Sequence, residues 1–216
     1  QQNRYTYYPD TEVYRIAETL REKKIPADGI TLDIHYMDRY QLFTWDKSRF
    51  PDPLKMTKRL KELGFQTTVI VDPGIKIEPG AAAYERGLKE DVYIKYSDGK
   101  NYSGEVWPGW CYFTDFTSEK GRAYWKREVK FFADNGVSGI WNDMNEPAYF
   151  DTPGVKVDTF DELPEPQSQL FMQNDNGEIV GHYEVRNLYG SGMAQATHQA
   201  LTKTRPNERP FILTRS

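Results

Sequence analysis

Cysteine and histidine are scarce in this sequence. Its 216 residues include one cysteine, Cys111, and three histidines. A single cysteine excludes a disulfide within the chain, and so few histidines argue against a Cys- or His-rich zinc site. The thiol count does not indicate a cellular compartment, so the localisation stays open.

Long apolar runs and an excess of one charge are also missing. No stretch approaches the length of a membrane span, and no signal peptide opens the chain. The 28 Lys and Arg residues nearly balance 32 Asp and Glu residues, for a formal net charge of −4. This balance gives no reason to expect nucleic acid or an acidic membrane surface as a partner. The abrupt ends suggest a piece of a longer protein.

Aromatic residues, in contrast, are abundant. Tyr, Trp and Phe make up 14% of the chain, and many lie in Gly- and Pro-rich connections, as Tyr5, Trp107 and Trp110 do. Packing beneath loops explains most single aromatic residues. As a set, rings on rigid loops would suit a ligand with flat apolar faces and polar edges, such as a sugar.

Short β-branched runs alternate with longer amphipathic patterns, which predicts parallel βα units. The predicted helices cover residues 10–24, 53–63, 118–134 and 187–203, and the predicted strands cover 29–35, 65–71, 137–142 and 210–214. A hairpin is expected to turn at residues 97–99.

Polar residues follow the predicted strands. At their carboxyl ends lie Asp33, His35, Asp72, Asp143, Asn145 and Arg215. Such ends form the catalytic face of a (β/α)8 barrel, whereas a doubly wound sheet often carries a Gly-rich phosphate loop, which is missing here. The prediction is an α/β fold that is a portion of a (β/α)8 TIM barrel, with parallel strands alternating with helices.

The chain is too short for a complete barrel, which takes roughly 250 residues. Residues 1–216 are therefore expected to form a partial catalytic barrel domain with about half the strands. Within it, residues 73–116 and 144–186 are predicted to be long loop insertions, and connections of that length are typically functional or hold small subdomains.

The strongest local motif is the run Trp-Asn-Asp-Met-Asn-Glu-Pro at residues 141–147. Side chains alternate along a strand, so Asp143 and Asn145 can face the barrel axis together if the strand geometry persists. A carboxylate at a strand end is held stiffly, as a nucleophile or base requires. The alternative is that Asp143 caps a helix or turn, and residue chemistry alone leaves both readings open.

Asp33 and His35 form a second candidate group. Two residues apart on a strand, their side chains can share a face. Together with Asp143 or Asp72 they could ligate a metal; alternatively, Asp33 binds substrate hydroxyl groups and His35 supports it. We favour the second interpretation, with no metal and no cofactor. A serine hydrolase has little support, because no Gly-x-Ser-x-Gly elbow occurs.

The sequence resembles the catalytic barrel of glycoside hydrolase family 31 over essentially its whole length. Residues 141–147 match the nucleophile signature of that family, Trp-x-Asp-Met-Asn-Glu-Pro. Further matches follow in the family's order, at residues 32–37, 43–46, 50–53, 71–75, 106–109, 115–117, 187–190 and 209–216. One such motif would be weak evidence, whereas the ordered set is specific.

The resemblance implies roles for individual residues. Asp143 matches the catalytic nucleophile, and Glu146 matches an acidic residue of the signature that supports catalysis. The sugar-binding pocket would be formed by Asp33, Ile75, Trp107, Met144, Arg215 and Tyr5. Tyr5 departs from the pattern, because relatives usually carry Trp after the Arg that is Arg4 here.

The resemblance also implies a reaction. Relatives that act on α-xylosides tend to carry Lys-x-Asp-Phe-Gly-Glu, so this form of the signature implies retaining hydrolysis of terminal α-linked glucose from an oligosaccharide. The family's acid/base Asp lies in a Trp-Thr-Gly-Asp run that is absent, so the chain alone is expected to be inactive. Alternatives are a non-catalytic carbohydrate-binding or regulatory relative and a metal-dependent barrel hydrolase. The oligomeric state stays open.

Overall fold

A parallel five-stranded sheet forms the centre of the computed structural model, which describes residues 1–148, 151–152, 155–156 and 170–215. Its strand order is β1-β2-β3-β8-β13, and each neighbouring pair is parallel. The strands are β1 (Gln2–Asn3), β2 (Gly29–Leu32), β3 (Gln66–Val71), β8 (Gly139–Asn142) and β13 (Phe211–Thr214). This order confirms the predicted parallel βα units.

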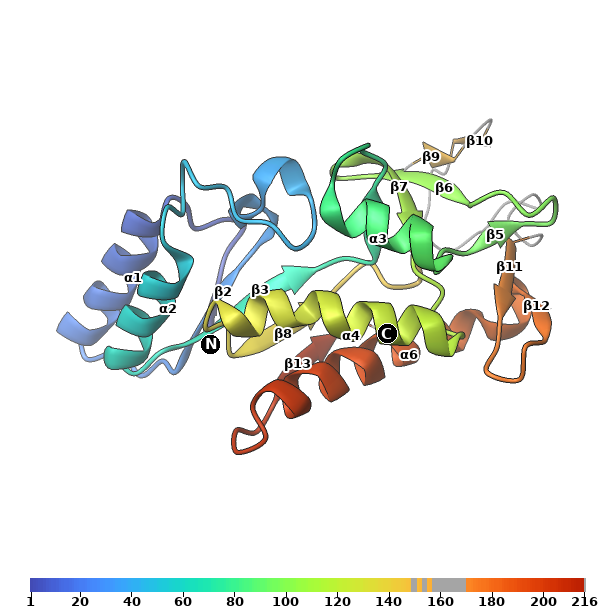
Figure 1. Ribbon diagram of the computed structural model, residues 1–216. Helices are drawn as coiled ribbons and strands as arrows, with labels where there is room; N and C mark the ends of the chain where they lie inside the picture. Colours follow the sequence, from blue (N-terminus) through green and yellow to red (C-terminus); the bar gives the residue numbers. More distant parts are fainter. Residues whose placement is uncertain (149–150, 153–154, 157–169, 216) are drawn as a thin grey trace.

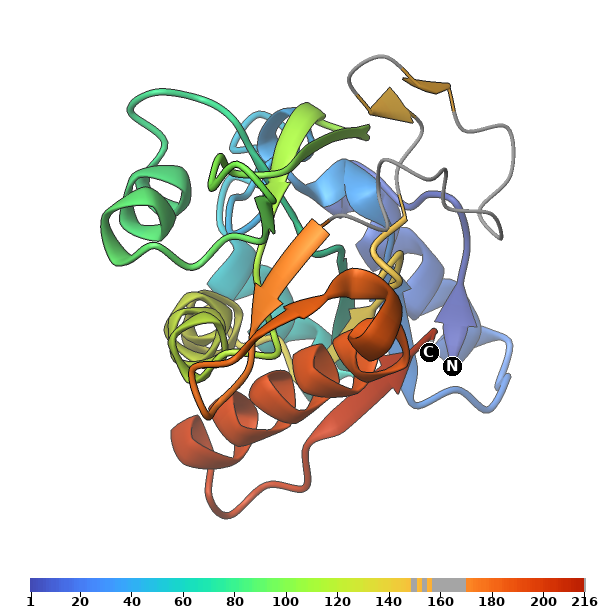
Figure 2. The same cartoon turned by 90° about the vertical axis from the view of Figure 1, so that its right-hand side faces the viewer.

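Helices connect these strands. They are α1 (Asp10–Glu22), α2 (Pro53–Glu62), α4 (Glu119–Asp134) and α6 (His182–Thr204). Figures 1 and 2 show α4 and α6 side by side, with α6 packed along β8 and β13. In the described ranges, no helix combines the length and apolar character needed to cross a membrane.

Local capping explains where two of these helices begin. The Asp52 carboxylate accepts a hydrogen bond from the N–H of Lys55 at 2.9 Å, and Pro53 occupies the first turn of α2. Ser118 Oγ accepts the N–H of Gly121 at 3.0 Å in the first turn of α4. Both caps satisfy N–H groups that a helix leaves without an internal partner, which fixes the start of each helix.

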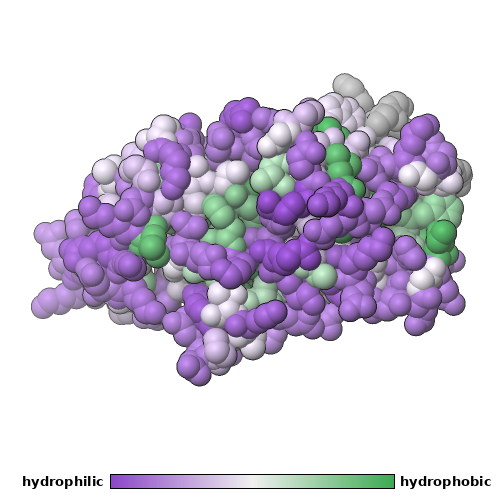
Figure 3. Space-filling model, in the orientation of Figure 1, coloured by the Kyte–Doolittle hydropathy of each residue, from purple (hydrophilic) through white to green (hydrophobic). Residues whose placement is uncertain are grey.

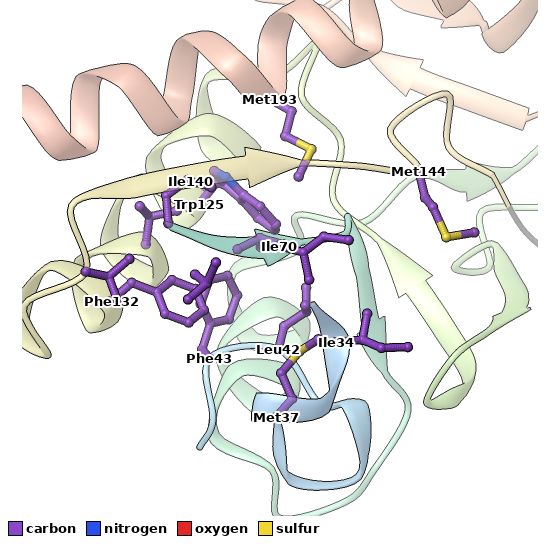
Figure 4. Close-up of a cluster of buried hydrophobic side chains, with 14 of the residues drawn as sticks. Ile34, Met37, Leu42, Phe43, Ile70, Trp125, Phe132, Ile140, Met144 and Met193 are labelled. Atoms are coloured by element: carbon purple, nitrogen blue, oxygen red, sulfur yellow. The ribbon is translucent and has the colours of Figure 1, made fainter. Parts of the chain in front are cut away.

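Aromatic side chains of α4 fill the core beneath the sheet. The Phe43 ring lies 5.3 Å from Trp125 and 5.6 Å from Phe132, measured between ring centroids. Trp125 Nε1 donates a hydrogen bond to Thr197 Oγ1 at 3.0 Å, which joins α4 to α6. Figure 4 shows these rings together, while Met144 lies apart from them beyond the end of β8. The face of the molecule that Figure 3 shows is mainly hydrophilic.

Two predicted elements differ most from the structure. The strand predicted over residues 29–35 ends at Leu32, and Ile34–Tyr36 form a 3-10 turn, because the Asp33 carboxylate accepts the N–H of Ile34 at 2.8 Å. The prediction that His35 extends this strand is therefore wrong. Helix α6 starts at His182, five residues before the predicted start at residue 187.

Residues 73–116 contain a helix and four strands. They are β4 (Gly74–Lys76), α3 (Ala82–Glu90), β5 (Lys95–Tyr96), β6 (Ser103–Val106) and β7 (Gly109–Phe113). The predicted turn at residues 97–99 is present, since the N–H of Gly99 donates to the carbonyl of Tyr96 at 2.9 Å. Figure 1 shows these elements beyond the arrowheads of β3 and β8.

The described part of residues 144–186 contains the strands β9 (Asp151–Thr152), β10 (Val155–Lys156), β11 (Leu170–Gln173) and β12 (Ile179–Gly181). Two of them pair with strands of residues 73–116. β9 pairs with β6, and β11 pairs with β5, both antiparallel. Asp115 adds a further link: its Oδ1 accepts from Thr117 Oγ1 at 2.6 Å, and its Oδ2 accepts from the N–H of Gln173 at 2.8 Å. The two segments therefore fold against each other.

A substitution at Gly121 can test how closely α4 approaches the end of β7. A methyl group at this position would come within 1.8 Å of the Asp115 carbonyl oxygen. Gly121→Ala must therefore displace the helix, and we expect the free energy of unfolding of the intact protein to fall by about 2–3 kcal/mol in urea titrations. Gly29→Ala is the matched control, because its nearest contacts would lie at 3.6 Å. Equal stabilities of the two variants would contradict the packing described here.

Burial of His182 makes a pH dependence testable. Burial, and secondarily the charge of Arg186, lowers the pKa of His182 from 6.5 to about 4. Between these values the unfolded chain binds the proton more readily, so stability is lost as the pH falls from 6.5 to 4. The loss from this group is roughly 3 kcal/mol.

Urea unfolding of the intact protein at a series of pH values measures this loss. His182→Gln should flatten the acid limb of the stability curve, whereas His198→Gln, at an exposed position of the same helix, should leave it unchanged. An acid limb that is the same in wild type and His182→Gln would refute the assignment.

Candidate functional site

Three neighbouring strands end in register at the carboxyl edge of the parallel sheet. The last paired residues are Val71, Asn142 and Thr214. The ladder continues one residue further, since the N–H of Asp143 donates to the Val71 carbonyl at 3.3 Å and that of Arg215 to the Asn142 carbonyl at 3.1 Å. Because neighbouring strands lie about 4.8 Å apart, Asp72, Asp143 and Arg215 form one row.

Arg215 lies between two carboxylates. Its Nε is 2.9 Å from Glu146 Oε1, and its Nη1 is 3.8 Å from Asp143 Oδ1. The side chains of Arg215 and Glu146 are 38% and 36% exposed, and that of Asp143 is 19% exposed. The guanidinium thus orients both acids, and Asp143 keeps an accessible surface that a ligand can reach.

The run that follows Asp143 does not continue as a strand. Met144 has a φ of 50°, in the left-handed region, so the alternation that would place Asp143 and Asn145 on one face does not persist. Asn145 is fully buried instead, and its Nδ2 donates to Thr214 Oγ1 at 2.9 Å. This bond anchors the loop after β8 to β13.

Trp107 and Met144 come together from distant parts of the chain. Trp107, in the turn between β6 and β7, donates its indole N–H to the Met144 sulfur at 3.1 Å. The indole is 43% exposed while Met144 is buried. Together they form an apolar surface beside Asp143, because Met144 is the next residue in the chain.

Ile75 and Tyr5 have contacts of other kinds. Ile75 is buried in β4 and lines a cavity of about 140 Å³ with Leu42, Phe43 and Tyr84. Tyr5 is exposed and contacts His35 edge to face, with ring centroids 4.9 Å apart. The structure therefore brings Asp33, Asp143, Met144, Glu146, Arg215 and Trp107 to the carboxyl edge.

His35 belongs to an aromatic cluster. Its ring stacks on Tyr8 at 5.3 Å and meets Tyr40 edge to face at 5.5 Å. Burial lowers the pKa of His35, which favours the neutral imidazole. Within the described ranges, no three His, Cys, Asp or Glu side chains converge as a metal site requires.

Asp33 and Asp72 follow β2 and β3, on the side of Asp143 that is opposite to Arg215. Burial raises the pKa of Asp33, and the charge of Asp143 raises it further, against the hydrogen bond from Ile34. Asp72 is 6% exposed, and burial raises its pKa well above the usual range, with the charges of Asp143 and Asp33 adding to the effect. The sequence pointed to Asp72 only by its place at a strand end; its burial was not foreseeable.

A parallel βα sheet with acids and an arginine at its carboxyl edge has the arrangement of a catalytic (β/α)8 barrel domain. The comparisons with known proteins specify the family. The model of the glycosyl hydrolases family 31 TIM-barrel domain matches residues 1–216, and the chain belongs to this family.

Its relatives include enzymes with known names and structures. Alpha-glucosidase 2 of Bacillus thermoamyloliquefaciens is 42% identical over 218 residues, covering 100% of this chain and 26% of that protein. A family 31 α-glucosidase of Bacteroides thetaiotaomicron is 37% identical, with a TM-score of 0.76, over 100% of this chain and 33% of that one.

The structure of a glucosidase II alpha subunit is also similar. It has a TM-score of 0.86 and 33% identity, over 99% of this chain and 22% of that one. The chain therefore spans about a fifth to a third of the length of these relatives.

Proposed function

We propose that this chain is part of a retaining α-glucosidase that releases terminal α-linked glucose from oligosaccharides, with Asp143 as the nucleophile. The observation that carries the proposal is the position of Asp143, partly exposed at a strand end with its carboxylate facing Arg215, in a barrel of family 31. The names of the relatives supply the substrate class.

The reaction proceeds in two displacements. The Asp143 carboxylate attacks the anomeric carbon and forms a glycosyl ester, while a general acid protonates the leaving oxygen. The conjugate base then removes a proton from water, which attacks the anomeric carbon, releases glucose and regenerates the carboxylate. Two inversions give net retention.

Neighbouring residues hold the sugar and the nucleophile. Arg215 orients Asp143 and Glu146, and in the proposed complex Arg215 and Asp33 bind sugar hydroxyl groups more strongly as the ring flattens in the transition state. Trp107 and Met144 form the apolar wall. Tyr5 and Ile75 are proposed as further wall residues: Tyr5 is exposed beside His35, and Ile75 follows Asp72 by three residues in β4.

The acid/base partner is proposed to lie outside residues 1–216. In a retaining pair the two carboxyl groups are about 5–5.5 Å apart, and the acid must reach the leaving oxygen. Glu146 is paired with Arg215, and Asp72 is buried. The relatives are three to five times longer than this chain, so they contain ample sequence for the second acid.

Covalent trapping tests the nucleophile. The intact protein is incubated with a fluorinated glucosyl fluoride, digested and mapped by mass spectrometry, with the label expected on Asp143. Asp143→Asn should lower kcat by at least about 10³-fold and abolish labelling, because an amide cannot attack. Asp134→Asn, in an exposed ion pair of α4, is the control and should behave as wild type. Label on any other residue would overturn the mechanism.

The location of the acid/base gives a separate prediction. The isolated 216-residue chain should show no measurable hydrolysis of p-nitrophenyl α-glucoside, since it contains one half of the catalytic pair. The intact protein, assayed at the same molar concentration, is the positive control. Steady turnover by the isolated chain would place the second acid within these residues.

A further inference from the structure

Asp72 has no role in the reaction as described, yet it adjoins the proposed nucleophile. Val71 pairs with Asn142, so the next residues, Asp72 and Asp143, are neighbours on adjacent strands. Residues in register project to the same face of a sheet, and the strands are about 4.8 Å apart. Arg215 occupies the corresponding position on the other side of Asp143.

The surroundings of the two carboxyl groups differ. Asp143 faces the Arg215 guanidinium at 3.8 Å and is partly exposed. Asp72 is nearly inaccessible, and its Oδ1 is buried without a hydrogen-bond partner among the residues that the structure describes. A buried carboxylate with an unpartnered oxygen is costly, and a group in this position keeps its proton instead.

The charges around Asp72 favour the same protonation state. The groups that act on it are the acids Asp33, Asp143 and Glu146 and the cation Arg215. The Tyr36 phenol and the Cys111 thiol also lie close enough to interact with it. Three acids against one guanidinium disfavour a further negative charge, and the most buried acid is the one that stays neutral.

We propose that Asp72 is a positioning residue: its carboxyl group stays protonated and donates an O–H hydrogen bond to the Asp143 carboxylate. This proposal rests on Asp143 as the nucleophile. A neutral donor on one side and Arg215 on the other fix the orientation of the carboxylate, and the bond to an ionised acceptor is stronger than one between neutral groups. No proton is transferred, so Asp143 remains the anion that attacks.

Two substitutions in the intact protein separate this role from its alternatives. Asp72→Asn keeps a neutral N–H donor of similar shape, and its kcat should stay within about tenfold of wild type. Asp72→Ala removes the donor, and its kcat, normalised to the fraction of enzyme that can be trapped covalently, should fall about 10- to 100-fold with little change in KM. Asp134→Asn serves as the neutral control.

Two results would overturn the proposal. If Asp72→Asn is as impaired as Asp72→Ala, Asp72 acts as an anion. If Asp72→Ala has the kcat of wild type per trapped site, the residue is only structural.

Infrared difference spectroscopy of the free protein supplies a readout that needs neither turnover nor a folded Asp72→Ala. Near neutral pH, wild type minus Asp72→Asn should show the carbonyl band of a protonated carboxyl group, and Asp143→Asn should shift that band. Absence of the band contradicts the proposal even if the enzyme is active. A protein that shows the band but neither hydrolyses α-glucosides nor traps the label refutes the proposed function and leaves the protonated Asp72 standing.

Discussion

The hydrogen-bond ladder between β3, β8 and β13 is the constraint on which the site depends. It continues one residue past the strands, and this extension places Asp72, Asp143 and Arg215 in one row. Backbone hydrogen bonds set the distance between the strands, so the positions of these three charged residues do not depend on the conformation of a flexible loop. The helices α4 and α6 contribute indirectly, because α6 packs against β8 and β13 and the Trp125–Thr197 bond joins α4 to α6.

The same row brings several negatively charged groups close together, and their mutual repulsion destabilises the fold. Asp33, Asp72, Asp143 and Glu146 interact around Arg215, the cation that pairs with Asp143 and Glu146. Protonation of Asp72 relieves part of this repulsion, because a neutral acid adds a donor without adding charge. In the proposed mechanism, burial therefore separates the roles of the two acids: the accessible Asp143 attacks, and the inaccessible Asp72 positions it.

Much of this arrangement could be predicted from sequence because it follows from periodicity. The apolar strands and the polar residues that follow them place Asp33, Asp143 and Arg215 on one edge. The turn after Asp33 could not be foreseen, since its carboxylate bonds to the next N–H and redirects His35 into a tyrosine cluster. Ile75 matched a motif by order alone, and no linear pattern shows that it is buried beside Leu42, Phe43 and Tyr84.

The apolar wall formed by Trp107 and Met144 is positioned by different elements from those that position the charged residues. Asp143 is positioned by the parallel sheet, whereas Trp107 comes from the β6–β7 turn and reaches Met144 across 37 positions of sequence. Met144 can accept this contact because its left-handed backbone turns the chain directly after Asp143. Met144 thus links the parallel sheet to the hairpin of β6 and β7. Under the proposed function, a change in the hairpin alters the wall that a sugar meets while the ladder keeps the carboxylates in place, so substrate preference can vary independently of the row of charged residues.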